Sequence, residues 1–308
     1  MTARPARRRP RVPPAVMRLG VRQLGRRCLD PALPWPVQRT RLDQLTRTSL
    51  LPRGTTITEQ EIAGMRAEVV SARDCDARRT VIHFHGGGYC VGSALTPRSW
   101  AAHLSAQAGY RVVLPEYRLA PEHPHPAALE DARAVLAALS AEAGPGSVVV
   151  SGDSAGGGLA LALALSLRDE GQELPAGCIL LSPWLELGRD RRAVPDLVRR
   201  DVVLSPGWLD ACARAYAAPA AWADPSVSPL RAAPAGLPPL LIQAGTDELL
   251  APDAELLAAR AADAGTDVTY TRWPRLWHDF VLQPGLLAAA DSALAQAAWF
   301  LKKVRPSA

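Results

Sequence analysis

The chain has 308 residues, of which 48% are apolar and 21% are charged, a composition typical of globular proteins. This composition excludes an intrinsically disordered chain, a collagen-like chain and a small disulfide-stapled scaffold. A chain of this length buries roughly three quarters of the surface that its unfolded form exposes, so its folding does not depend on a metal or a disulfide. The longest apolar run near the middle, residues 159–165, is far shorter than the ~20 residues that span a bilayer.

Charge is distributed unevenly along the chain. The first 50 residues contain twelve arginines, no lysine and two acidic residues, whereas the remaining 258 contain 23 basic and 28 acidic residues. Residues 1–15 combine arginine with proline, and we expect them to form a basic, disordered arm. A weak contact of this arm with an anionic membrane surface is left open, and no nucleic-acid partner is expected. Arginines interrupt the apolar stretch after the arm, which argues against a signal peptide and for a cytoplasmic protein.

Five cysteines are scattered along the chain without a C-x-x-C pair: Cys28, Cys75, Cys90, Cys178 and Cys212. Their odd number and spacing argue against a disulfide framework and against a zinc site, so no metal is expected. Free thiols agree with a reducing cytoplasm.

From residue 66 onward, short apolar runs alternate with helical stretches. Strands are expected at 68–70, 80–84, 111–114, 147–151, 178–181, 240–244 and 268–273, and helices at 99–108, 127–143, 155–169, 253–264 and 286–304. Several of the strands are almost entirely apolar, which is typical of parallel strands covered on both faces. The alternation predicts an α/β fold with a mostly parallel, doubly wound sheet and helices on both faces.

Two segments interrupt this alternation. Residues 16–65 precede the first expected strand, and residues 185–235 form an insertion longer than an ordinary crossover. Long connections in α/β folds often lie above the carboxyl ends of the strands, where functional sites form. We therefore expect an N-terminal cap segment at 16–65 and a main α/β domain at 66–308, which carries a cap insertion at about 185–235.

The strongest chemical signal is a G-x-S-x-G motif at residues 152–156, with Ser154 at its centre. An apolar strand precedes the motif directly and a helical run follows it. This context is the one required by a nucleophile elbow, in which a strained turn presents the serine hydroxyl at the edge of the sheet. The helix that begins behind the serine favours developing negative charge.

A second signal is the run His85-Gly86-Gly87-Gly88-Tyr89, which follows another expected strand. Three consecutive glycines are entropically costly, and they let backbone N–H groups approach a reacting oxygen closely. We expect Gly87 and Gly88, together with Ala155, to donate the hydrogen bonds of an oxyanion hole. His85 is expected to brace this loop rather than to act as a base.

A serine nucleophile needs a histidine base, and the base needs a carboxylate that orients it. After an elbow of this kind the chain order is serine, acid, histidine. His278 is the only histidine after Ser154, so it is the expected base. Asp247 follows the strand before the histidine-bearing strand and is the expected acid, with Glu248 as the alternative. Asp253 is interpreted as a helix cap that could support the acid loop.

These motifs resemble those of the α/β-hydrolase superfamily and, within it, the hormone-sensitive-lipase-like esterases of bacterial family IV, in the GDSAG subgroup. The matching pieces occur in the family's order over most of the chain, at 85–89, 117–124, 152–157, 224–225, 228–230, 247 and 278–280. The chain departs from the family's pattern at Gly158, where members commonly have asparagine.

The resemblance implies a serine carboxylester hydrolase that acts on short to medium acyl esters through an acyl-enzyme intermediate, with a helical cap and no cofactor. Tyr89 beside the glycine loop and Trp184 before the insertion are expected to line the substrate pocket. An amidase or deacetylase and a lactone hydrolase use the same triad and stay open as alternatives. A non-catalytic ligand receptor on this fold, such as the plant gibberellin receptors, lacks the catalytic histidine that this chain has. A homodimer is left open.

Overall fold

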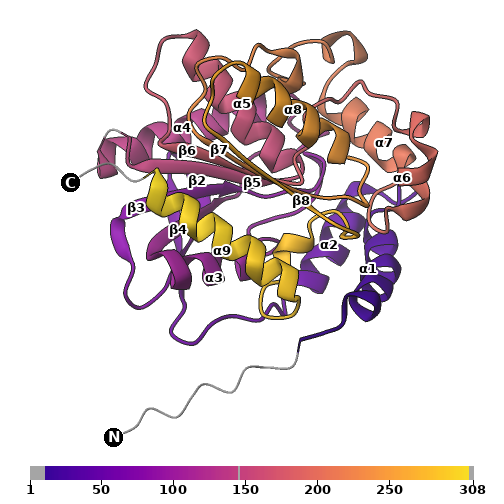
Figure 1. Ribbon diagram of the computed structural model, residues 1–308, viewed down its shortest axis with the longest axis horizontal. Coiled ribbons are helices and arrows are strands. Elements are labelled where there is room, and N and C mark those ends of the chain that lie inside the picture. The colour runs from indigo at the N-terminus through magenta and orange to yellow at the C-terminus, as the bar shows by residue number, and fades with distance from the viewer. Residues whose placement is uncertain (1–10, 145, 305–308) are drawn as a thin grey trace, which may run out of the picture.

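A single eight-stranded sheet runs through the middle of the protein (Figure 1). The computed structural model describes residues 11–144 and 146–304, so most of the expected basic arm lies outside the described residues. The strands occur in the spatial order β1-β2-β4-β3-β5-β6-β7-β8. Their bounds are β1 Thr56–Ile62, β2 Met65–Ser71, β3 Asp76–Phe84, β4 Tyr110–Pro115, β5 Val148–Asp153, β6 Gly177–Leu181, β7 Leu240–Gly245 and β8 Val268–Trp273.

Parallel pairing extends from β4 to β8, whereas β1 and β2 are antiparallel to their neighbours. Every residue of β4, β5, β6 and β7 is buried. Such continuous burial is the reason why these strands are mostly apolar and lack an alternating pattern, although Arg111, Ser151, Asp153 and Gln243 are buried polar exceptions. The expected mostly parallel sheet is therefore confirmed.

Helices cover both faces of the sheet, each with its own hydrophobic core. On one face lie α4 (Ala127–Ala143), α5 (Ala155–Asp169) and α8 (Ala251–Asp263), and on the other lie α3 (Arg98–Ala108) and α9 (Ala288–Lys303) (Figure 1). Short 3₁₀ turns occur at Arg191–Ala193, Pro219–Ala221, Pro229–Arg231 and Phe280–Leu282. This arrangement confirms the doubly wound α/β class that the alternation predicts.

Strand β1 was not predicted from the sequence. Its residues are mostly polar and exposed, and only Ile62 is buried. Because an edge strand has few neighbours to pack against, it lacks the apolar pattern by which strands are recognised. The boundary expected at residue 65 consequently falls inside the β1–β2 hairpin, and residues 56–65 belong to the sheet.

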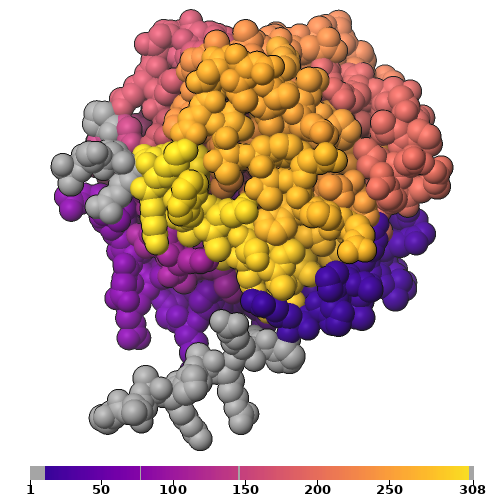
Figure 2. All heavy atoms as spheres, viewed as in Figure 1, coloured from indigo at the N-terminus to yellow at the C-terminus, as the bar shows by residue number. Residues whose placement is uncertain are grey.

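The two segments that interrupt the alternation lie side by side at one end of the molecule (Figure 1). The first segment forms α1 (Pro14–Cys28) and α2 (Trp35–Thr46), and the second forms α6 (Pro195–Arg200) and α7 (Pro206–Tyr216). We call these four helices the cap. The indole Nε1 of Trp208 on α7 donates to Oε1 of Gln38 on α2 at 2.8 Å, which joins the two halves. Figure 2 shows the indigo N-terminal segment lying against the yellow C-terminal part of the chain.

Candidate active site

Ser154 occupies the sharp turn between β5 and α5. Its backbone adopts φ 54° and ψ −119°, a strained combination for a residue with a side chain. A Cβ on Gly152 would collide with the backbone of Gly156, and a Cβ on Gly156 would collide with the carbonyl of Phe84. Both glycines of the motif are therefore required by the close approach of neighbouring backbone. The turn has the geometry of the expected nucleophile elbow.

The glycine loop lies beside this turn and is held in place by aromatic contacts. The His85 ring stacks on Tyr117 with ring centroids 4.4 Å apart, and the Tyr117 hydroxyl donates to the His85 carbonyl at 2.7 Å. Gly87 has φ 115°, and its carbonyl accepts the N–H groups of Cys90 and Val91. His85 thus has the bracing position that the sequence analysis assigns to it.

The three expected oxyanion donors lie in different surroundings. Gly87 lines the same cavity as Ser154, together with Gly86. A Cβ on Gly88 would lie 2.9 Å from Cβ of Cys212 on α7, so this glycine packs against the cap. Ala155 is the first residue of α5, where the backbone N–H has no acceptor within the helix. Its N–H therefore has no competing helical hydrogen bond.

His278 follows β8 and is 3% exposed. Its Nδ1 lies 3.4 Å from Oε2 of the fully buried Glu248. The carboxylate of Asp247 instead pairs with Arg18 Nη1 at 3.1 Å and with Arg200 Nη1 at 3.3 Å. The expectation that Asp247 faces the imidazole therefore needs correction, because the carboxylate beside Nδ1 belongs to Glu248. Adjacent residues in the loop after β7 turn their side chains to different sides, and the sequence does not fix which side meets the histidine.

Ser182, at the end of β6, connects the acid loop to the histidine loop. Its hydroxyl donates to Glu248 Oε2 at 2.8 Å and accepts the backbone N–H of Asp279 at 3.2 Å. Its own φ is 44°, so its backbone is strained like that of Ser154. Sequence reasoning missed this residue, although its place at the carboxyl end of a central strand is a signal for site residues.

Asp279 is a second acidic neighbour of the histidine. Its Oδ2 lies 3.1 Å from Nε2 of His278, and its side chain is 19% exposed. Desolvation raises the pKa of Asp279 to about 7. Burial alone would lower the pKa of His278, but the carboxylates of Asp279 and Glu248 raise it well above its ordinary value. The imidazole is thus flanked by carboxylates on both ring nitrogens.

An apolar cavity of about 510 Å³ opens above Ser154 and His278. This volume is within the range of roughly 300–1,000 Å³ that is typical of small-molecule sites. Helices α1 and α2 supply much of its wall, through Val16, Met17, Val21, Leu24, Leu42 and Leu45. Leu204 and Trp208 of the cap insertion complete the wall. The cap thereby encloses an apolar space over the serine.

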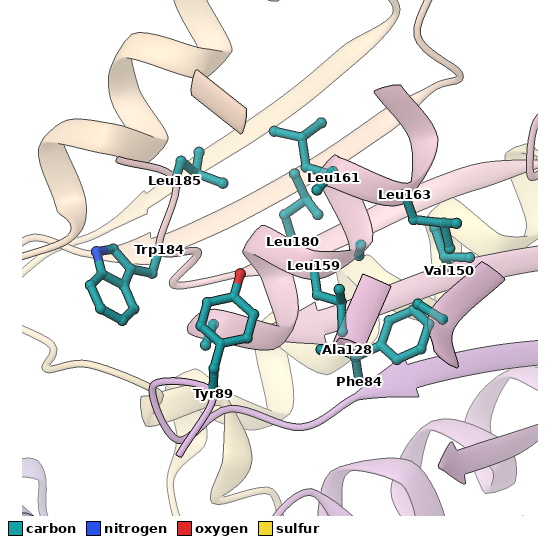
Figure 3. Close-up of a cluster of buried hydrophobic side chains, with 14 of the residues drawn as sticks. Phe84, Tyr89, Ala128, Val150, Leu159, Leu161, Leu163, Leu180, Trp184 and Leu185 are labelled. Carbon is teal, nitrogen blue, oxygen red and sulfur yellow. The ribbon is translucent and has the colours of Figure 1, made fainter. Parts of the chain in front are cut away.

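Tyr89 and Trp184 do not belong to this cavity. Both side chains are buried, and Figure 3 shows them within one cluster of buried hydrophobic side chains. The Tyr89 ring stacks on Tyr216 of α7 with centroids 3.8 Å apart and lies 6.3 Å from Trp184. The expectation that they line the substrate pocket is corrected, because both side chains are buried in the core and neither is among the residues that line the cavity.

Asp253 is not a helix cap. It lies in the first turn of α8 with no side-chain capping bond, and it is fully buried. Its carboxylate accepts from Arg191 at 2.6 and 2.9 Å and from the N–H of Glu186 at 3.1 Å. Asp253 therefore anchors the start of the cap insertion to α8.

Within residues 11–144 and 146–304, no helix is long and apolar enough to cross a membrane. A family model described as the α/β hydrolase fold matches residues 81–282.

Several named proteins are similar to this chain over most of its length. A putative acetyl-hydrolase of Mycobacterium tuberculosis is 36% identical over 259 residues, which are 84% of each chain. An acetyl-hydrolase of Streptomyces hygroscopicus is 38% identical over 73% of this chain and 75% of its own. An esterase of Acinetobacter venetianus is 35% identical over 84% of this chain and 86% of its own.

Solved structures agree with these similarities. A crystal structure of an esterase from the bacterial hormone-sensitive lipase family superimposes with a TM-score of 0.88 at 31% identity, covering 95% of this chain and 99% of that one. A mutant of the esterase E40 gives a TM-score of 0.87 at 32% identity, covering 92% and 97% of the two chains.

Proposed function

This chain belongs to the α/β-hydrolase family and is a carboxylester hydrolase of the hormone-sensitive-lipase type, and from that premise we propose that Ser154, His278 and Glu248 form its catalytic triad. The support is geometric. Ser154 lies at a strained turn on the floor of the cavity, His278 lines the same cavity, and Glu248 is the carboxylate next to His278 Nδ1.

In the proposed reaction, Oγ of Ser154 attacks the carbonyl carbon of the ester while Nε2 of His278 takes the hydroxyl proton. The tetrahedral oxyanion accepts hydrogen bonds from the N–H groups of Gly87, Gly88 and Ala155. His278 then gives the proton to the leaving alkoxide, and the alcohol departs. Water, deprotonated by the same imidazole, attacks the acyl-enzyme and releases the acid with the serine regenerated.

Glu248 has the orienting role in this scheme. Its carboxylate keeps the proton on Nδ1, so that Nε2 is free to act as the base. The Ser182 hydroxyl fixes one of the Glu248 oxygens, which limits the orientations open to that carboxylate. A buried carboxylate held in this way also stabilises the imidazolium that forms when Ser154 loses its proton.

The apolar lining of the cavity favours binding of the acyl group of the substrate. Its wall is mainly aliphatic, and apolar burial stabilises a bound acyl chain by about 25 cal/mol per Å². We therefore propose short to medium acyl esters as substrates, with chains that extend from Ser154 along α1 and α2.

The observation that carries the proposal is the strained conformation of Ser154 in a cavity that His278 also lines. Ser154→Ala is expected to lower kcat for p-nitrophenyl butyrate by about 10⁶, because the triad acts as a unit. A fluorophosphonate probe should label the wild-type protein at Ser154 and leave the variant unlabelled. The control is Ser292→Ala on α9, which should keep full activity.

Labelling at another residue, or wild-type turnover by Ser154→Ala, would contradict the assignment. A matched p-nitroanilide measures the amide reaction in the same assay. Hydrolysis of the anilide at a rate comparable to that of the ester would make the amidase alternative the better description.

A further inference from the structure

Asp247 lies next to Glu248 in the loop after β7 and has no catalytic task in the proposed triad, yet it is a buried charge. Its residue is 6% exposed, and its two carboxylate oxygens pair with different arginines. Arg18 comes from α1 and Arg200 from α6, so one arginine belongs to each half of the cap. The carboxylate thus joins both halves of the cap to the loop that carries Glu248.

Arg18 makes this junction more extensive than a single ion pair. Its guanidinium also donates to the carbonyl oxygens of Arg200 and of Arg275, the latter at 3.3 Å. Arg275 in turn donates its N–H to Thr246 at 2.8 Å, and Asp247 donates its own N–H to Leu276 at 3.0 Å. The acid loop and the histidine loop are therefore bonded to each other at the point where α1 is attached.

Helix α2 is fastened elsewhere. Arg39 donates to Glu122 at 2.7 and 2.9 Å and to the carbonyls of Cys90 and Ala120 at 2.8 and 2.9 Å. None of these partners belongs to the acid loop or to the histidine loop. Loss of the Asp247 junction should consequently loosen α1 while α2 stays in place.

We infer that Asp247 is a positioning residue that anchors α1 and α6 over the catalytic loops and thereby sets the acyl-chain preference. The inference rests on the proposed function, because it assigns Glu248 to the triad. Neither Asp247 nor Arg18 lines the cavity, so their replacement removes no contact with the acyl group. An effect on long acyl chains would have to act through the position of α1, which supplies Val16, Met17, Val21 and Leu24 to the wall.

The test compares Asp247→Asn, Arg18→Gln, the double variant and Glu248→Gln on p-nitrophenyl acetate and octanoate. In Asp247→Asn and Arg18→Gln we expect KM for octanoate to rise about tenfold, while kcat for acetate stays within about threefold of wild type. In the double variant, KM for octanoate should rise no further than in the more strongly affected single variant, because the two changes break one shared junction. Glu248→Gln should lower kcat by about 10⁴ for both esters, since the imidazole loses its orienting carboxylate.

Hydrogen exchange supplies a readout that does not depend on turnover. Amides of α1 should exchange faster in Asp247→Asn and Arg18→Gln, and those of α2 should not change. Arg22→Gln, an exposed arginine on the same helix, is the matched control and should leave both KM and exchange unchanged.

The outcomes separate the two proposals. Unchanged octanoate KM and unchanged α1 exchange in both single variants would overturn the anchoring role and leave the triad intact. A loss of about 10⁴ in kcat for both esters in Asp247→Asn, with a mild effect of Glu248→Gln, would instead make Asp247 the triad acid and overturn the Glu248 assignment. If Asp247→Asn unfolds, Arg18→Gln decides the anchoring role by itself.

Discussion

At the scale of single residues, the unusual feature of the site is the pair of carboxylates around one imidazole. Glu248 lies next to Nδ1 of His278, and Asp279 lies 3.1 Å from Nε2, the nitrogen that would take the serine proton. An ionised Asp279 favours the imidazolium and so keeps the base protonated. Because the two groups interact closely, they titrate as a coupled pair rather than independently.

This geometry predicts a shift of the pH–rate profile in Asp279→Asn. Removing the carboxylate takes away a negative neighbour that raises the pKa of His278, so the imidazole becomes neutral at lower pH. The acidic limb of kcat/KM should therefore move to lower pH. Profiles of kcat/KM for p-nitrophenyl acetate between about pH 4 and 9 measure the shift.

Asp291→Asn is the control for this experiment, because Asp291 pairs with Arg11 at 2.8 Å, away from the histidine, and should leave the profile unchanged. An acidic limb that moves to higher pH in Asp279→Asn would show that Asp279 does not hold the proton on His278.

At the scale of elements, the first turn of α5 is defined by what it packs against. Gly156 lies against the backbone of Phe84, and Gly157 lies against the ring of Pro183. Gly158 lies against the carbonyl of Trp184. A Cβ at Gly158 would collide with that carbonyl and lie 2.8 Å from the Tyr89 hydroxyl. The glycine at position 158 is therefore required by this backbone arrangement.

Gly158→Ala should consequently destabilise the protein, although alanine has the higher helix propensity. Overpacking against a fixed backbone lowers the free energy of unfolding by about 1–3 kcal/mol. The higher helix propensity of alanine raises it by about 1 kcal/mol. Thermal unfolding should show Tm lower by a few degrees.

The matched control is Gly20→Ala in the interior of α1, where a Cβ would meet no atom within 4 Å. That variant should be as stable as wild type or more stable, through propensity alone. A Gly158→Ala protein that is also stabilised would show that the turn adapts to a side chain.

At the scale of the whole molecule, the site is built from two parts with different attachments. The sheet and its connecting loops carry Ser154, Glu248 and His278, whereas α1 contributes cavity wall and no residue of the proposed triad. Helix α2 keeps its own attachments through Arg39. The residues of the proposed triad should therefore keep their arrangement when α1 is removed.

Deletion of residues 1–31 tests this division. We expect a folded protein that still reacts with a fluorophosphonate at Ser154, because the loops around the serine are held by the sheet. Turnover of octanoate should fall more than turnover of acetate, because only the longer chain reaches the aliphatic wall of α1. A series of p-nitrophenyl esters with increasing chain length measures the effect.

Deletion of residues 1–10 alone is the control and should leave the series unchanged, since among the residues that the structure describes the cavity wall begins at Val12. Identical chain-length profiles for the deletion of 1–31 and the wild type would mean that α1 does not shape the substrate pocket.

The sequence by itself determined the α/β class and the position of the sharp turn at Ser154, and it selected His278 as the proposed base, because each depends on local order along the chain. Apolar strands identify a buried parallel sheet, flanking glycines identify a sharp turn, and a single histidine follows the serine. Only the tertiary structure decided which of the adjacent Asp247 and Glu248 meets the imidazole. It also decided that Tyr89 packs in the core and that two cap arginines converge on Asp247. These are contacts between segments far apart in the chain, and they depend on the direction in which each side chain leaves its loop, which neither composition nor spacing specifies.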